Sequence, residues 1–259
     1  MRTKRWIILT LLSLCLHSVN AQIAPFKEGE QLKYAGSYYM SKLWTNLAEI
    51  KLEVLPVDKA PKPCYRLKGS ASSYAAWDSY FKIRDVYQSW IEVATLKPII
   101  FKRDVIEGTF VKDEKYIFKH KQNIAHQILI GKSKFKNERD LTIVPNTYDM
   151  ISALYYVRTL AFDKMQIGKV TNISVLIDNK LEQIIVKYQG TEQIKTDNLG
   201  TFKCYKLAVN IGNTKIIKYK ETNNIWITAD NNRVPLLIKA EIPVGFIQIK
   251  ITEMKGLKY

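Results

Sequence analysis

Apolar and polar side chains alternate along most of this chain, and that period-two pattern limits its fold more than any other feature. Residues 48–54, 184–188 and 246–251 are clear examples, with an apolar side chain at every second position. A β-strand turns successive side chains to opposite faces, so each segment is typical of a strand with one face on a core. Turn sequences at 197–200 and 230–233 separate such segments. The pattern predicts a mainly β protein with a large curved antiparallel sheet or a half-open β-barrel.

One segment near the middle of the chain departs from this pattern. Met150 and Leu154 belong to a set of apolar side chains that recur at the spacing of an α-helix. Thr147 or Asp149 could cap its start, because a short polar side chain can accept hydrogen bonds from the first free amides of a helix. We therefore expect one central helix near residues 147–160.

A short motif occurs twice, once on each side of this helix. Cys64-Tyr65-Arg66-Leu67 is followed by Trp90 and Pro98, and Cys204-Tyr205-Lys206-Leu207 is followed in the same order by Trp226 and Pro235. A duplicated strand meander would produce this echo, and chance matching of short β motifs is the alternative. We interpret residues 22–259 as a single β-rich domain of two similar halves, about 22–144 and 165–259, joined by the helix.

The first 21 residues have the pattern of a cleavable export signal. Basic residues at positions 2, 4 and 5 precede an apolar run, and short side chains lead up to Ala21. Cleavage is expected between Ala21 and Gln22. The apolar run is about half as long as a membrane-spanning helix, so a retained anchor is not expected. These features predict an exported protein, periplasmic or secreted, whose mature chain has no transmembrane segment.

The mature chain is strongly basic. The full sequence holds 40 Lys and Arg against 24 Asp and Glu, and loss of the first 21 residues leaves a formal charge of +13. This charge favours an anionic partner such as a lipid head group or an acidic glycan, or peripheral contact with a membrane. Scattered lysines on solvated strand faces are the plainer explanation. Nucleic acid is not expected, because the chain has no zinc-finger or RNA-binding signature and carries an export signal.

Two cysteines remain after cleavage, Cys64 and Cys204. In an exported protein they could form one long-range disulfide. Each also lies in a strand pattern, where a buried free thiol is ordinary. Both states remain open from the sequence.

Six side chains are candidates for ligand binding. Aromatic side chains could line an apolar mouth or stack on sugar rings, although core packing accounts for most aromatics in a β domain. Arg158 lies on the apolar stripe of the expected helix, so it either pairs with a buried acid or points into a ligand cavity. The candidates are Tyr74, Trp77, Trp90, Tyr155, Arg158 and Trp226.

No recognised catalytic, cofactor or metal motif is present, so no catalytic residue, cofactor or metal is expected. His120 and His126 would face the same side of a strand but lack the spacing of a metal site. A pair of carboxylates facing each other across a cleft could still hydrolyse a glycan without any sequence motif. The acids considered for such a pair are Asp85, Glu92, Asp104, Glu107 and Asp230.

Three segments resemble one exported bacterial family that is known only by a domain-of-unknown-function label. They are the opening Phe26-Lys27-Glu28-Gly29-Glu30-Gln31-Leu32-Lys33-Tyr34, the segment 149–158, and the closing Trp226-Ile227-Thr228-Ala229-Asp230-Asn231-Asn232-Arg233-Val234-Pro235. The resemblance implies an exported protein with a mainly antiparallel β fold and no established activity. More loosely, the architecture is similar to the half-open β-barrels that carry lipoproteins across the periplasm.

These observations favour a non-enzymatic envelope protein that binds an amphiphile, a glycan or a protein partner. A carboxylate-dependent glycan hydrolase and a structural or assembly factor of the cell envelope are the alternatives.

Overall fold

The computed structural model describes residues 24–40, 42–57, 63–130, 136–211, 223–242 and 245–259. The expected signal segment, with its cleavage site between Ala21 and Gln22, lies outside these residues.

Within these described residues, fifteen strands form one large sheet, which runs in the order β8-β7-β6-β5-β4-β3-β2-β1-β15-β14-β13-β12-β11-β10-β9. Neighbouring strands are antiparallel except for the short parallel pair β9–β10. The strands are β1 (Gln31–Met40), β2 (Leu43–Leu55), β3 (Cys64–Ser73), β4 (Ile83–Glu92), β5 (Pro98–Glu107), β6 (Phe110–Lys119), β7 (Ile124–Ile130), β8 (Lys136–Thr142), β9 (Thr147–Tyr148), β10 (Val170–Ile177), β11 (Lys180–Lys195), β12 (Thr201–Ile211), β13 (Asn224–Thr228), β14 (Pro235–Ile242) and β15 (Gly245–Lys255).

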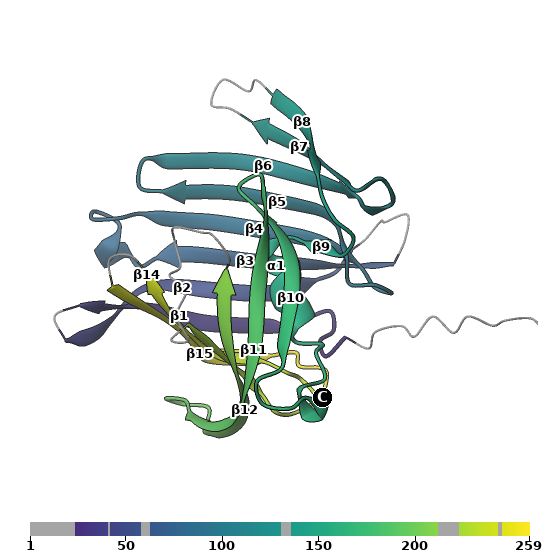
Figure 1. The fold of residues 1–259 in the computed structure, drawn as a ribbon. Helices are drawn as coiled ribbons and strands as arrows, with labels where there is room; N and C mark the ends of the chain where they lie inside the picture. The colour runs from purple at the N-terminus through teal and green to yellow at the C-terminus, as the bar shows by residue number, and fades with distance from the viewer. Residues whose placement is uncertain (1–23, 41, 58–62, 131–135, 212–222, 243–244) are drawn as a thin grey trace, which may run out of the picture.

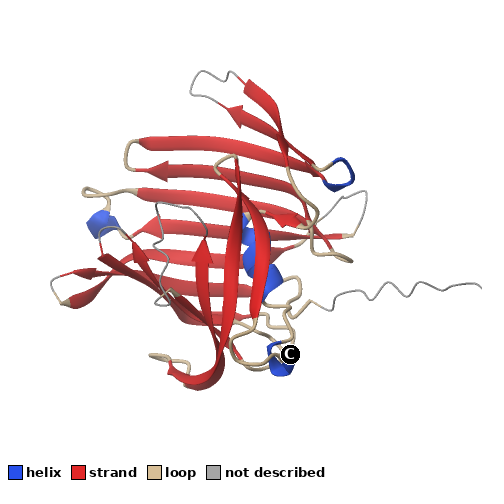
Figure 2. Ribbon diagram, viewed as in Figure 1, coloured by secondary structure: helices blue, strands red, loops and turns tan. Residues whose placement is uncertain are grey.

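The sheet curls without closing, because its two ends, β8 and β9, do not pair with each other. Strands β10 and β11 cross in front of the middle of the sheet (Figure 1), and the red strands of Figure 2 enclose the central helix. The expectation of a mainly β, half-open architecture is confirmed.

The central helix α1 (Met150–Val157) is shorter than the range expected from the sequence. It begins at Met150 because Thr147 and Tyr148 pair with β10 as strand β9. Asp149 is the cap: its side chain accepts hydrogen bonds from the amides of Ile151 and Ser152, and the Ser152 hydroxyl accepts from the Asp149 amide. This reciprocal arrangement satisfies amide groups that would otherwise be buried without partners.

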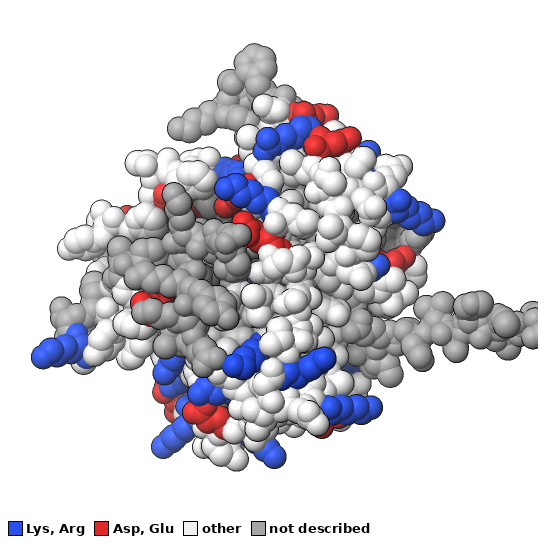
Figure 3. All heavy atoms as spheres, viewed as in Figure 1, with Lys and Arg blue, Asp and Glu red and all other residues white. Residues whose placement is uncertain are grey.

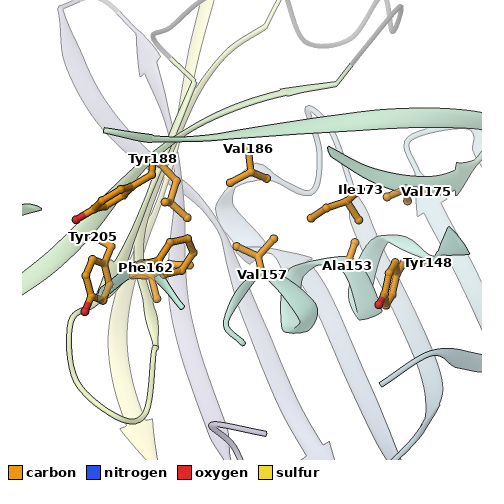
Figure 4. Close-up of a cluster of buried hydrophobic side chains, with 11 residues drawn as sticks. Tyr148, Ala153, Val157, Phe162, Ile173, Val175, Val186, Tyr188 and Tyr205 are labelled. Carbon is orange, nitrogen blue, oxygen red and sulfur yellow. The ribbon is translucent and has the colours of Figure 1, made fainter. Parts of the chain in front are cut away.

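The helix fills the space between two opposing parts of the curled sheet. On one side, Ala153 and Val157 pack with Ile173, Val186 and other side chains of β10–β13 (Figure 4). On the other side, Tyr155 packs with Phe26, Leu67 and Ile91. The interior of the curl at the helix is therefore a packed apolar core.

The repeated motif of the sequence corresponds to a repeated arrangement of three strands. In β3–β5, Arg66 lies opposite Trp90, and a bulge follows Trp90 before Ile91 meets Pro98. The strands β12–β14 have the same register and the same bulge. Lys206 lies opposite Trp226, and a bulge follows Trp226 before Ile227 meets Pro235. In both units, two basic side chains flank the tryptophan ring, namely Arg66 and Lys102 at Trp90, and Lys206 and Lys239 at Trp226. The echo is thus a match in backbone geometry as well as in sequence.

The tip of the β10–β11 hairpin contacts strands β5 and β6 across the curl. Asp178 and Asn179, between β10 and β11, both have positive φ angles of 46° and 67°. Asp178 pairs with Arg103 of β5 and with Lys112 of β6, whose Nζ lies 3.0 Å away. The Tyr116 hydroxyl donates to the Asn179 side chain over 2.9 Å. We call these contacts the hairpin clasp, because they hold β10–β11 against β5–β6 without strand pairing.

Candidate functional site

A partly open cavity of about 750 Å³ lies at one end of strands β3–β6. Its volume lies within the range of about 300–1,000 Å³ that is typical of small-molecule sites. We call it the basic cavity. Its apolar walls and floor are formed by Trp90, Pro98, Ile99, Ile100 and Phe118, and its polar wall includes Glu92, Thr95, Lys97, Lys119, His120 and Lys121.

Two turns place the lysines beside the apolar floor. Lys97 ends the turn between β4 and β5, and Lys119 and Lys121 lie where β6 ends in the short helix at His120–Gln122. Because β4–β5 and β6–β7 turn back at the same end of the sheet, side chains distant in sequence meet there. Within the described part of the chain, none of the three lysines takes part in an ion pair.

His120 anchors this end of the sheet. Its Nε2 donates to the Pro98 carbonyl over 2.8 Å, and its ring stacks on Phe118. Burial lowers the pKa of His120 below its usual value, which favours the neutral form of the ring. The positive charge around the cavity therefore comes from the lysines.

The candidates Tyr74 and Trp77 lie far along the strands from this cavity. They belong to the connection between β3 and β4, at the opposite end of the sheet, where the Trp77 indole donates to the carbonyl of Asn46 over 3.1 Å. Both side chains are at least partly exposed.

Trp90 and Trp226 occupy equivalent places in the two three-strand units, but only Trp90 lines the basic cavity. The Trp226 ring is buried, and its Nε1 donates to Glu192 over 2.9 Å. The structure therefore does not bring the two tryptophans into one site.

Tyr155 and Arg158 lie inside the molecule. Arg158 makes a bidentate ion pair with Glu30, at 2.6 and 2.8 Å, and its guanidinium stacks over the rings of Phe26 and Tyr155. Of the two interpretations of Arg158, the structure shows the buried ion pair. Arg158 also borders a polar hollow of about 350 Å³ near the C-terminus.

The considered disulfide is not formed in this structure, because Cys64 and Cys204 are both free thiols. They lie on different strands, β3 and β12, which are separated in the sheet by β2, β1, β15, β14 and β13. Cys64 lines the basic cavity, whereas Cys204 is fully buried in the core.

The acids considered for hydrolysis are dispersed. Asp85 and Glu107 are adjacent, and burial, followed by the charge of Glu107, raises the pKa of Asp85 to about 6. Neither lines the basic cavity or the polar hollow. Glu92 lies in the wall of the basic cavity, and Asp104 lines a third cavity of about 540 Å³ together with Asp113. Asp230 instead caps its own turn, accepting from the amides of Asn232 and Arg233. In the described residues, no cluster of three or more His, Cys, Asp or Glu side chains could hold a metal ion.

Of the residues that line the basic cavity, the sequence singled out Trp90 as a ligand-binding candidate, Glu92 as a possible catalytic acid and Cys64 as a possible disulfide partner, and it missed the rest. The signal was present in Lys97-Pro98-Ile99-Ile100 and in Phe118-Lys119-His120-Lys121, where lysines adjoin apolar side chains. Only the strand order places these two stretches at the same end of the sheet.

A family model described as "Protein of unknown function (DUF3108)" matches residues 33–252. The chain belongs to the DUF3108 family. The resemblance identified from the three sequence segments is thereby confirmed. Among curated proteins, none matches this DUF3108 chain.

One solved structure shares the fold of this DUF3108 chain. It is a β-barrel-like protein of the DUF1849 domain from Brucella abortus, with a TM-score of 0.61 and 8% identity, and the match covers 90% of this chain and 100% of that one. An exported protein with a YmcC-like fold from Bacteroides fragilis matches with a TM-score of 0.34 and 12% identity over 89% of this chain and 97% of its own. A protein from Parabacteroides distasonis described as a lipoprotein matches with a TM-score of 0.32 and 10% identity over the same shares. In the described part of the DUF3108 chain, no helix is long and apolar enough to cross a membrane.

Proposed function

We propose that this chain is an exported, non-enzymatic binding protein of the cell envelope that holds an anionic amphiphile in the basic cavity. The ligand class is an acyl chain that carries a negatively charged head group. The observation that carries the proposal is one cavity of about 750 Å³ in which an apolar floor adjoins three lysines. The export signal of residues 1–21 supports a place in the envelope.

The chemistry of the cavity favours an amphiphile over the other partners considered. Ile99, Ile100 and Phe118 offer an apolar surface that an acyl chain can cover, which is favourable by about 0.8 kcal/mol for each methylene removed from water. Lys97, Lys119 and Lys121 provide cations at the rim, where a carboxylate or phosphate could stay partly hydrated. Among the described residues, Glu92 is the only carboxylate that lines the basic cavity, so this cavity does not offer the two facing acids that glycan hydrolysis needs.

The proposal is tested by titrating the mature protein with saturated fatty acids of increasing length in a calorimeter. We expect the affinity to rise about fourfold with each added methylene until the cavity is filled. Alkyl glucosides of the same lengths are the uncharged comparison, and we expect them to bind at least about tenfold more weakly because they lack the ionic contact.

Ile100→Asp places a carboxylate in the apolar floor and is expected to abolish fatty-acid binding. Ile128→Asp, at a half-buried isoleucine of β7 that lines none of the three cavities, is the matched control and should bind as the wild type does. Thermal unfolding of both variants checks that they are folded. Equal binding by the two variants, or an affinity independent of chain length, would contradict the proposal.

A further inference from the structure

A band of exposed apolar side chains lies at the end of the sheet opposite the basic cavity. The turns between β1 and β2, β3 and β4, and β5 and β6 all lie at this end, along the left margin of Figure 1. Six of the large apolar side chains on these turns and on the strand ends beside them each leave between 39% and 80% of their surface exposed. We call them the aromatic rim: Leu43, Trp44, Tyr74, Tyr80, Phe81 and Phe110.

The aromatic rim is one connected feature. The connection between β3 and β4 rests on β2, because the Tyr74 amide donates to the Leu47 carbonyl over 2.9 Å. The Phe81 ring packs over Gly108 in the next turn along the sheet, 3.2 Å from where a Cβ atom would stand. The Gly108 amide donates to the Lys82 carbonyl over 2.8 Å. Three successive turns thus present their apolar side chains as one row.

The chemistry of the rim matches the interface of a lipid bilayer. Tryptophan and tyrosine concentrate at the boundary between head groups and acyl chains, because their rings are apolar and their N–H and O–H groups can stay hydrated. Lys42 and Lys82 are exposed beside Leu43 and Phe81 on the same turns, and basic groups are attracted to anionic lipids. Asp78, on the same connection, is paired with Arg84 at 2.6 Å. In Figure 3 the left margin is mostly white, with blue at its lower end.

We propose that the aromatic rim is a membrane-docking surface, which inserts its exposed side chains into the interface of an anionic bilayer while the sheet stays in water. This inference is independent of the proposed ligand. The basic cavity is formed by the turns at the other end of the same strands, so a variant at one end leaves the other end intact.

The test is co-sedimentation of the mature protein with vesicles of about three parts phosphatidylethanolamine to one part phosphatidylglycerol. We expect the wild type to sediment with these vesicles. The double variant Leu43→Ser/Tyr80→Ser should bind at least about tenfold more weakly, because it loses two side chains that reach the interface. Ile167→Ser removes an equally exposed side chain from the segment before β10 and should sediment as the wild type does.

Two further measurements separate a lipid surface from a charge effect or a protein partner. Brominated lipids should quench the fluorescence of Trp44 in the wild type, and the Trp44→Phe variant should lose that part of the quenching. Lys42→Glu/Lys82→Glu should weaken sedimentation on anionic vesicles. A wild type that stays in solution, or a Leu43→Ser/Tyr80→Ser variant that sediments fully, would overturn the proposal and leave a protein partner for the rim.

Discussion

Arg158 and Glu30 form a bidentate ion pair with both side chains buried, through two hydrogen bonds of 2.6 and 2.8 Å. The same guanidinium donates through Nε to the Arg233 carbonyl and through Nη2 to the Asn232 carbonyl. The pair joins three segments far apart in the sequence, namely the opening segment, the end of α1 and the turn before β14.

These are also the three segments that carry the family resemblance. Glu30 and Phe26 come from the opening segment, Tyr155 and Arg158 from the helix, and Arg233 from the closing segment. Their meeting at a buried ion pair gives this signature a structural role, since it fixes where the helix enters the curled sheet. None of these five residues lines the basic cavity.

We predict that breaking this pair destabilises the fold. Glu30→Gln leaves the Arg158 cation buried without its counter-ion and should lower the free energy of unfolding by about 3–5 kcal/mol. The double variant Glu30→Leu/Arg158→Met removes both charges and should recover much of that loss. Urea unfolding followed by tryptophan fluorescence measures both effects.

The pair between Lys33 and Glu253 provides the control, because it is partly exposed at 2.9 Å. Glu253→Gln should change the stability far less than Glu30→Gln, since solvent screens the exposed charge. Equal losses in the two single variants would contradict a special role for the buried pair.

Asp85 should make the stability depend on pH. Burial and the nearby Glu107 raise its pKa to about 6, so the folded state holds this proton more tightly than the unfolded state, where the pKa has the ordinary value of about 3.9 for an aspartate. Its contribution to stability is therefore complete below about pH 4 and is lost as the pH rises through about 6. Asp85→Asn should remove this part of the pH dependence. Urea unfolding across that range tests it, and parallel curves for wild type and variant would count against the assignment.

The hairpin clasp should control local opening of β10–β11. Asp178→Asn keeps a residue that tolerates a positive φ but removes the negative charge that faces Arg103 and Lys112. Hydrogen exchange of the β10–β11 amides should accelerate about tenfold, in line with the loss of a charge-assisted hydrogen bond. The amides of β1–β2, which the clasp does not contact, should exchange as before. Faster exchange throughout the sheet would indicate global destabilisation instead.

The two free thiols can test ligand binding in the basic cavity, because Cys64 lines the cavity and the buried Cys204 serves as an internal control. Burial raises the pKa of the Cys64 thiol, and it raises that of Cys204 to about 12. We expect an alkylating reagent to modify Cys64 in the folded protein, and a near-saturating fatty acid to slow that reaction about tenfold. Cys204 should react only after unfolding. Unchanged labelling of Cys64 in the presence of ligand would place the ligand elsewhere.

The alternation of side chains predicted the fold class well, because a strand with one buried face requires an apolar residue at every second position of the sequence. The extent of the helix was less predictable. Residues 147 and 148 fell within the expected range of the helix, yet they form β9, since pairing with β10 is a tertiary contact that local propensity does not encode.

The candidate site was only partly predictable. Trp90 was found because its motif recurs around Trp226, and the structure shows the same pattern of basic side chains at both rings. The cavity itself depends on which turns lie at the same end of the sheet, and on the bulge after Trp90. Neither property follows from local sequence, so the lysines of the basic cavity could not be distinguished from lysines on other solvated faces.

The central claim is that the basic cavity holds an anionic amphiphile. The most direct measurement is native mass spectrometry of the mature protein isolated under mild conditions from its own envelope, beside the Ile100→Asp variant prepared in the same way. We predict an added mass on the wild type that organic extraction identifies as an acyl chain with an acidic head group, and its loss in the variant. A wild type with the mass of the bare chain, or an adduct retained equally by Ile100→Asp, would contradict the claim.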